Sequence, residues 1–236
     1  MANMHQLYAA CVMYAGDFND WYPVWGGYDS SHPINQIKGE HYTRYVFGPD
    51  TTVNAPVPLG FVHNGHYSDE NLGYLYGGGF LGDGKIMWCP SFSNATGKTN
   101  LLSIEAYSNP SFMSTDGSGN VRSTYMFNPR MTEVTPTTAN VLRRYQKTSD
   151  ARALDVFMTD YMSSSSETTS GVKFDAQNWP HWPSKGMMAC FTDGSANYTR
   201  LAPTIFTAIT SVLITAETQQ SYLQYNTILN ALQNSQ

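Results

Sequence analysis

An Asp-Gly pair between two extended stretches limits the possible folds of this chain more than any other feature. Residues 186–192 are rich in side chains that fill a buried strand, and residues 195–201 form a second extended stretch after Asp193 and Gly194. An Asp-Gly pair supplies the two positive-φ positions of a type I′ turn, so the sequence predicts a β-hairpin with a two-residue loop. Alternation places Met187, Ala189 and Phe191 on one face, with Ala196 and Tyr198 on the matching face of the return strand.

Two more stretches, 121–127 and 154–159, also have the composition of strands. Together with the hairpin they predict an antiparallel meander over residues 121–201. Residues 1–18 carry apolar side chains mostly at spacings of three and four, which is typical of a helix with one buried face. We expect this helix to cover the apolar face of the meander. Its stripe consists of Met4, Leu7, Tyr8, Cys11, Met13, Tyr14, Ala15 and Phe18.

The first helix has signals for its end but none for its beginning. Asn19, Asp20 and Pro23 are expected to end it. The Met1 end has no Ser, Thr, Asp or Asn to cap the free backbone N–H groups. We therefore expect the helix to continue upstream of Met1.

The remaining segments predict long loops and a C-terminal extension. Residues 19–120 are a loop-rich insertion region, with a strand near 42–47, a short helix capped at Ser68-Asp69 and running to about Leu75, and a strand at 85–89. Residues 202–236 form an extension that is helical at 222–232 and ambiguous between strand and helix at 205–214. The sequence thus predicts one α+β domain over 1–236, with an N-terminal helix packed on a small antiparallel sheet.

Composition excludes several classes of protein. At 236 residues with a net charge of -5, the chain can bury a core but offers no positive surface for nucleic acid or an anionic membrane. Only 13% of residues are charged and 14% are aromatic, which favours a loop-rich exported protein. No run of about 18 apolar residues is present. Three cysteines allow at most one disulfide, which could join Cys89 to Cys190 or to Cys11.

Two groups of residues contain metal-binding side chains without a metal-binding pattern. His63 and His66, followed by Asp69 and Glu70, lack a third ligand with the right spacing for zinc, even with His32 and His41 counted. We expect them to be solvated loop residues. Asp17, Asn19 and Asp20 offer oxygens to calcium, but a helix-ending turn whose side chains bond to the backbone is the favoured interpretation. Asp150, Asp155, Asp160 and Asp175 are diffuse calcium candidates, and no cofactor is predicted.

The sequence contains no pattern typical of an activated nucleophile. There is no G-x-S-x-G, and Cys190 lies within a predicted strand, where a small buried side chain is expected; Cys11 lies in the helix stripe. We therefore expect a non-enzymatic protein. Loop-placed tryptophans favour an alternative, an exported glycan-binding or adhesive module, although subunit packing also enriches Trp. These tryptophans are Trp21, Trp25, Trp179 and Trp182.

The order of five short segments resembles a known family. YAGDFNDWYP, KIMWCPS, STYMFNP, DVFMTDY and H…ACFTDGS follow one another between Asn3 and about Leu201. This series resembles the G-type pseudopilin-like proteins of Planctomycetes, Verrucomicrobia and Lentisphaerae, which belong to the prepilin-type cleavage and methylation group. Their signature is a His, nine residues and Asp-Gly; here eleven residues separate His181 from Asp193. Cys89 and Pro90 match a further feature of the family.

The resemblance implies a structural subunit of a type II secretion or type IV pilus-like assembly. It implies a leader cut by a prepilin peptidase, then an apolar helix of about 20 residues that anchors the subunit in the inner membrane. The globular part would be periplasmic or at the cell surface. Its partners would be other pseudopilin subunits and secretion or pilus assembly proteins. G-type pseudopilins bind calcium in a C-terminal loop, so calcium stays open as a ligand.

Overall fold

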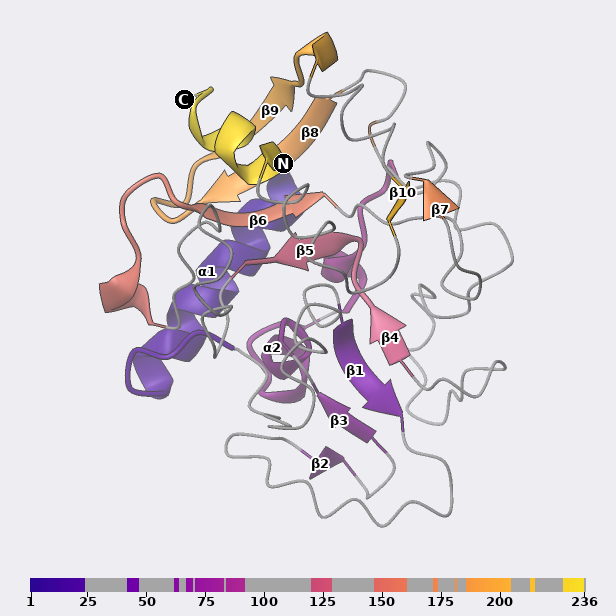
Figure 1. The fold of residues 1–236 in the computed structure, drawn as a ribbon. Coiled ribbons are helices and arrows are strands. Elements are labelled where there is room, and N and C mark those ends of the chain that lie inside the picture. The colour runs from indigo at the N-terminus through magenta and orange to yellow at the C-terminus, as the bar shows by residue number, and fades with distance from the viewer. Residues whose placement is uncertain are drawn as a thin grey trace, which may run out of the picture.

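A helix lies across a four-stranded antiparallel sheet in the computed structural model (Figure 1). The structure describes residues 1–23, 42–46, 62–63, 67–69, 71–82, 84–91, 120–128, 147–160, 172–173, 181, 186–204, 213–214 and 227–235. The helix is α1 (Ala2–Asp17), and the sheet has the order β5-β6-β8-β9. The predicted α+β class and the antiparallel meander are confirmed. The strands are β5 (Tyr125–Phe127), β6 (Val156–Asp160), β8 (Gly186–Phe191) and β9 (Ala196–Arg200).

The buried face of α1 follows the predicted apolar stripe with one exception. Met4, Leu7, Cys11 and Tyr14 are buried, whereas Met13 is 55% exposed. Met13 follows Cys11 by two residues, and residues two apart do not share a helix face, so its place in the stripe was wrong. Met1 provides no side-chain cap, as expected. Among the described residues, no helix has both the length and the apolar character that a membrane span requires.

The predicted end of α1 is confirmed by its backbone. The N–H of Phe18 donates to the carbonyl of Tyr14 at 3.0 Å, and the N–H of Asp20 donates to Ala15 at 2.9 Å. Asn19 and Asp20 have φ of 52° and 72°. Left-handed residues cannot continue a right-handed helix, so the chain turns away from the helix axis here.

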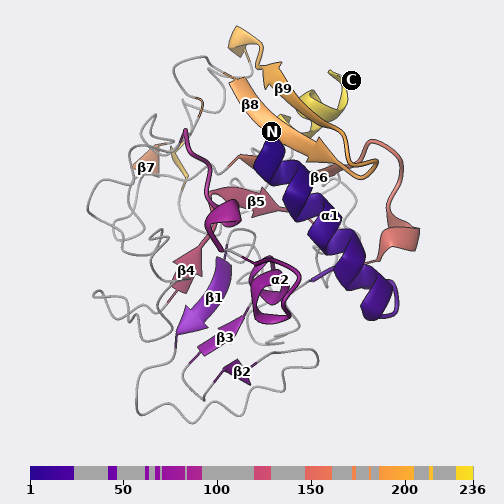
Figure 2. The same ribbon diagram turned by 180° about the vertical axis from the view of Figure 1, so that it is seen from behind.

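A second helix covers the opposite face of the sheet. Residues 227–233 are helical and lie on the far side of the sheet from α1, as the two opposite views agree (Figures 1 and 2). Ile228, Leu229 and Leu232 are fully buried. Thr199 on β9 bonds to Ser235 just after this helix, at 3.1 Å between their hydroxyl oxygens. Covering from both sides explains why all six residues of β8 are buried.

The hairpin between β8 and β9 has a three-residue loop. The N–H of Phe191 donates to Ser195 and the N–H of Gly194 donates to Phe191, both at 2.9 Å. Only Gly194 in the loop has a positive φ, of 84°. This is the arrangement of a type I turn followed by a left-handed glycine, so the predicted two-residue type I′ turn was wrong. Asp193 accepts a bond from the N–H of Ser195 through Oδ1 at 2.8 Å, which stabilises the turn without a positive φ.

The longer loop changes which hairpin residues share a face. Met188 pairs with Tyr198, and Cys190 pairs with Ala196. Directly paired residues point to the same side of the sheet. The prediction that Ala196 and Tyr198 share a face with Met187, Ala189 and Phe191 was therefore wrong. One extra loop residue shifts the register by one position and moves the whole return strand to the other face.

The predicted strand at 121–127 is two strands in two sheets. β4 (Asn120–Arg122) joins a sheet of order β2-β3-β1-β4, and β5 joins the main sheet. Between them, Ser123 Oγ bonds to both backbone groups of Tyr125, which replaces the strand pattern locally. The other strands of this sheet are β1 (Tyr42–Val46), near the predicted 42–47, β2 (Val62–His63) and β3 (Tyr67–Asp69).

Two local predictions in the insertion region were wrong. Ser68 and Asp69 pair with β1, and the short helix α2 (Gly73–Gly77) begins later without a side-chain cap. Residues predicted as a strand at 85–89 include the 3-10 turn η2 (Gly84–Met87), because a short apolar run does not distinguish the two by itself. The remaining elements are η4 (Thr148–Asp150) and the paired strands β7 (Val172–Lys173) and β10 (Leu213–Ile214).

Candidate functional site

Three residues that are far apart in the sequence meet at one end of the main sheet. Cys89 follows η2, Asp160 ends β6, and His181 precedes β8. One potential ligand atom from each lies within 4.8 Å of the others. Each residue comes from one of the segments that carry the family resemblance, KIMWCPS, DVFMTDY and H…ACFTDGS. We call these three residues the Cys-Asp-His cluster.

Asp160 is the centre of the cluster and has one oxygen without a partner. Its Oδ2 accepts the N–H of Met188 at 2.7 Å and lies 2.6 Å from His181 Nδ1. Its Oδ1 is buried and has no hydrogen-bond partner in the described part of the chain. Asp160 is 0% exposed, whereas the side chain of His181 is 21% exposed. The cluster therefore meets solvent on the His181 side.

Burial raises the pKa of the Asp160 carboxyl group above its usual value. The bond to His181 and the N–H of Met188 oppose this shift but are smaller in effect. The folded chain thus holds this proton more tightly than the unfolded chain does. As the pH rises above the ordinary range of Asp and through the folded pKa, ionisation of Asp160 lowers the stability of the fold.

Cys89 is buried beside Asp160, and its backbone is hydrogen-bonded. Its backbone N–H donates to Thr124 Oγ1 at 2.5 Å. Burial, followed by the negative charge of Asp160, raises the pKa of the Cys89 thiol. At neutral pH the sulfur is protonated, so Cys89 is not an activated nucleophile.

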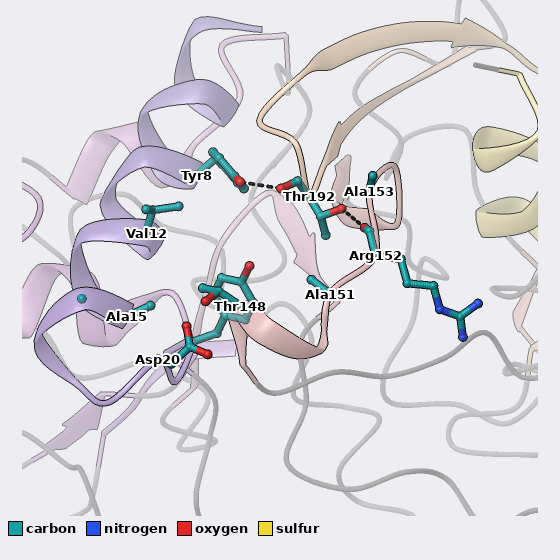
Figure 3. A pocket seen from close by; sticks show the side chains of 11 residues that line it. Tyr8, Val12, Ala15, Asp20, Thr148, Ala151, Arg152, Ala153 and Thr192 are labelled. Carbon is teal, nitrogen blue, oxygen red and sulfur yellow. Dashed lines mark hydrogen bonds between the residues drawn. The ribbon is translucent and has the colours of Figure 1, made fainter.

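A cavity of about 560 Å³ lies between α1 and residues 148–153 (Figure 3). Tyr8 donates to the carbonyl of Thr192 across it, and Thr192 Oγ1 donates to the carbonyl of Arg152. The side chain of Arg152 points away from the cavity in Figure 3. Asp20 is the only carboxylate in its lining. These side chains offer hydrogen bonds but no nucleophile paired with a base.

Asp20 is used by the fold and is not arranged for calcium. Its Oδ2 accepts the N–H of Ser149 at 3.0 Å, and its carbonyl accepts the N–H of Thr148 at 3.0 Å. The bonds from Ser149 lower the pKa of the Asp20 carboxyl group. The predicted helix-ending turn is present, but the side chain of Asp20 bonds to the backbone of the distant Ser149 and not to the turn itself. Asp150 and Asp155 lie in and after η4, and Asp155 accepts the N–H of Arg152 at 3.0 Å.

The structure describes one of the four candidate sugar-binding tryptophans. Trp21 is half-buried, forms a bridge with Lys147, and has its ring 4.9 Å from Lys147 Nζ. Trp25, Trp179 and Trp182 lie outside the described residues, as do His32, His41, His66, Glu70 and Asp175. His63 and Asp69 lie in the strands β2 and β3, so their prediction as loop residues was wrong. Asp17 is the last residue of α1.

The remaining predicted site residues are structural or belong to the cluster. Asp193 and Gly194 form the hairpin loop, and Pro90 is exposed next to Cys89. Cys11, Cys89 and Cys190 are all free buried thiols, so the structure contains none of the disulfides considered. Sequence reasoning singled out Cys89 and His181 but left Asp160 among four diffuse aspartates. The position of Asp160 could have singled it out, because it is the one of the four aspartates that directly follows a strand of the predicted meander.

The fold and the cluster define an α+β protein with one helix across an antiparallel meander, and with a buried Cys, a buried Asp and a half-buried His at one end of that sheet. No family model, curated protein or solved structure matches this chain.

Proposed function

We propose that this chain is the globular part of a non-enzymatic pilin-like subunit of a type II secretion or type IV pilus-like assembly. The observation that carries the proposal is the placement of α1 along one face of the meander β5-β6-β8-β9. A pilin-like subunit needs a helix that is fixed to its sheet at one end and free to extend at the other.

The surface of α1 also fits a role in assembly. Val12 and Met13 are 42% and 55% exposed, although both are large and apolar. Neither belongs to the buried face of α1, and Val12 also lines the cavity of Figure 3. Apolar side chains on an exposed helix face are suited to contact a neighbouring subunit. In this proposal α1 is the C-terminal part of a longer helix that packs among neighbouring subunits, and the sheet displays the loops.

The proposal places the protein outside the cytoplasm, anchored in the inner membrane through the upstream part of the helix. Its partners are other pseudopilin subunits and the assembly proteins that handle them. Cys89 lies within 4.8 Å of His181 and Asp160, but burial raises the pKa of its thiol, which fits a mechanical role better than nucleophilic catalysis.

The test uses the complete native gene, expressed in its source cells, with charged substitutions on α1. We expect Met13→Glu to abolish cross-linked multimers in the membrane fraction, because it buries a charge in the subunit contact. Gln6→Glu is the matched control, since Gln6 is also exposed on α1. Circular dichroism should show both variants folded. Unchanged multimers in Met13→Glu, or a native protein found entirely as a monomer outside the membrane fraction, would remove the proposal.

A further inference from the structure

We propose that the Cys-Asp-His cluster is a binding site for a thiophilic divalent cation of the zinc type. The ligands are Cys89 Sγ, a carboxylate oxygen of Asp160 and a ring nitrogen of His181. A thiolate, an imidazole and a carboxylate together form a ligand set that suits zinc better than calcium or magnesium, which prefer oxygen. Of these three residues, only Asp160 was among the histidines and aspartates that the sequence offered for zinc or calcium.

The unpartnered oxygen of Asp160 is the first observation behind this site. A buried carboxylate normally has both oxygens bonded, because leaving one without a partner costs the free energy of its lost hydration. Here Oδ2 has two partners and Oδ1 has none, although Asp160 is 0% exposed. A cation bound to Oδ1 would compensate that cost while the bond from Met188 to Oδ2 stays in place.

The spacing of the three side chains is the second observation. Tetrahedral zinc with bonds of about 2.0 to 2.3 Å holds its ligand atoms roughly 3.3 to 3.6 Å apart. The ligand atoms of the cluster already lie within 4.8 Å of one another. His181 Nδ1 and Asp160 Oδ2 are closer than this, at 2.6 Å, because a proton joins them. For His181 to share an ion with Asp160 Oδ1, its ring would have to turn away from Oδ2, which a side-chain rotation can achieve.

The surroundings of the cluster supply the outer hydrogen bonds that metal ligands usually have. The backbone and the side chain of Ser91 act to lower the pKa of the Cys89 thiol, which favours its anionic form. Met188 holds the second oxygen of Asp160. Such partners orient ligands and favour their anionic forms. Metal entry would displace the thiol proton of Cys89 to solvent and leave the remaining coordination position on the side of His181 that meets water.

Titration of the purified chain with Co²⁺ and Zn²⁺, after treatment with a chelator, tests the site. Co²⁺ reports its ligands by absorption, and a thiolate ligand adds a charge-transfer band. We expect one Co²⁺ per chain with that band, its displacement by Zn²⁺, and a higher melting temperature with Zn²⁺ than without. Failure of the wild-type chain to bind either ion overturns the proposal, whatever the variants do.

Single substitutions then assign the ligands. Cys89→Ser and His181→Ala should each weaken binding by more than roughly 100-fold, since outer partners alone are worth about 10- to 100-fold, and Cys89→Ser should also remove the charge-transfer band. Cys190→Ala and His5→Ala are the matched controls, because they remove a buried thiol and an exposed imidazole outside the cluster. Wild-type binding that persists in Cys89→Ser, or that is lost in Cys190→Ala instead, places the metal elsewhere and overturns the assignment.

Discussion

Gly194 shows how a single residue connects the hairpin to the first helix. Its φ of 84° belongs to the left-handed region, and a Cβ there would lie 2.8 Å from Tyr8 Cε1. Tyr8 in turn donates to the carbonyl of Thr192 in the same loop and meets Phe157 with ring centroids 5.0 Å apart. The loop must therefore have no side chain at this position for two independent reasons, backbone conformation and contact with α1.

Comparing two glycines separates these reasons. Gly79 has a similar φ of 78° but nothing within 4 Å of its Cβ position. Gly79→Ala should lower the free energy of unfolding by about 1 to 2 kcal/mol, the usual cost of a left-handed non-glycine residue. Gly194→Ala should lower the free energy of unfolding by more than Gly79→Ala does, because the ring of Tyr8 must also move. Urea unfolding of both variants measures the difference; equal losses would mean that the contact with Tyr8 adds nothing.

The elements of the main layer depend on one another because β8 is covered on both faces. α1 packs on one side and residues 227–233 on the other, so a strand of six buried residues is possible. Met188 and Cys190 share a face with Tyr198 and Ala196, and the alternate residues face the other side. The C-terminal helix is thus part of the core and not an appendage to it.

Leu229 tests the contribution of the C-terminal helix. Leu229 is 0% exposed, whereas Asn230 beside it is exposed. Leu229→Ala should lower the free energy of unfolding by about 2 to 5 kcal/mol, because it leaves a cavity between the helix and the sheet. Asn230→Ala should change it by less than about 0.5 kcal/mol, as is usual for surface positions. A small effect at Leu229 would indicate that the helix is only loosely attached to the sheet.

The molecule as a whole keeps all three of its thiols inside one core. Burial raises the pKa of Cys89, raises that of Cys190 to about 12, and raises that of Cys11 well above its usual value. Cys11 lies on α1 and Cys190 on β8, where the helix packs on the sheet. Cys89 lies after η2, in the Cys-Asp-His cluster.

Alkylation by iodoacetamide, with a chelator present, should find no fast-reacting thiol in the native protein. The reagent attacks thiolates, and the raised pKa values keep all three sulfurs protonated near neutral pH. In urea above the unfolding transition, all three should react at the rate of an ordinary cysteine. One thiol that reacts at least as fast in the native protein as in urea would indicate an activated nucleophile and contradict the non-enzymatic proposal.

The sequence by itself determined the local elements whose patterns are strong. The stripe from Met4 to Tyr14, the stop at Asn19 and Asp20, and the alternation around Asp193-Gly194 gave α1 and the hairpin nearly at their observed bounds. These features depend on interactions between residues close in the chain, so periodicity and turn chemistry are sufficient to predict them. The antiparallel meander followed because consecutive short strands pair with their neighbours.

Only the tertiary structure decided the loop length, the faces of β9 and the Cys-Asp-His cluster. Adding or removing one loop residue turns the side chains of the return strand to the opposite face of the sheet. An Asp-Gly pair is compatible with both loop lengths. Likewise, residues 84–87 became a turn in a region where Asn3 donates to the carbonyl of Trp88 and the N–H of Thr124 donates to Met87. Cys89, Asp160 and His181 are separated by long segments, so no local sequence pattern predicts that they lie close together. It follows from the order of strands in the sheet, which brings the end of β6 beside the start of β8.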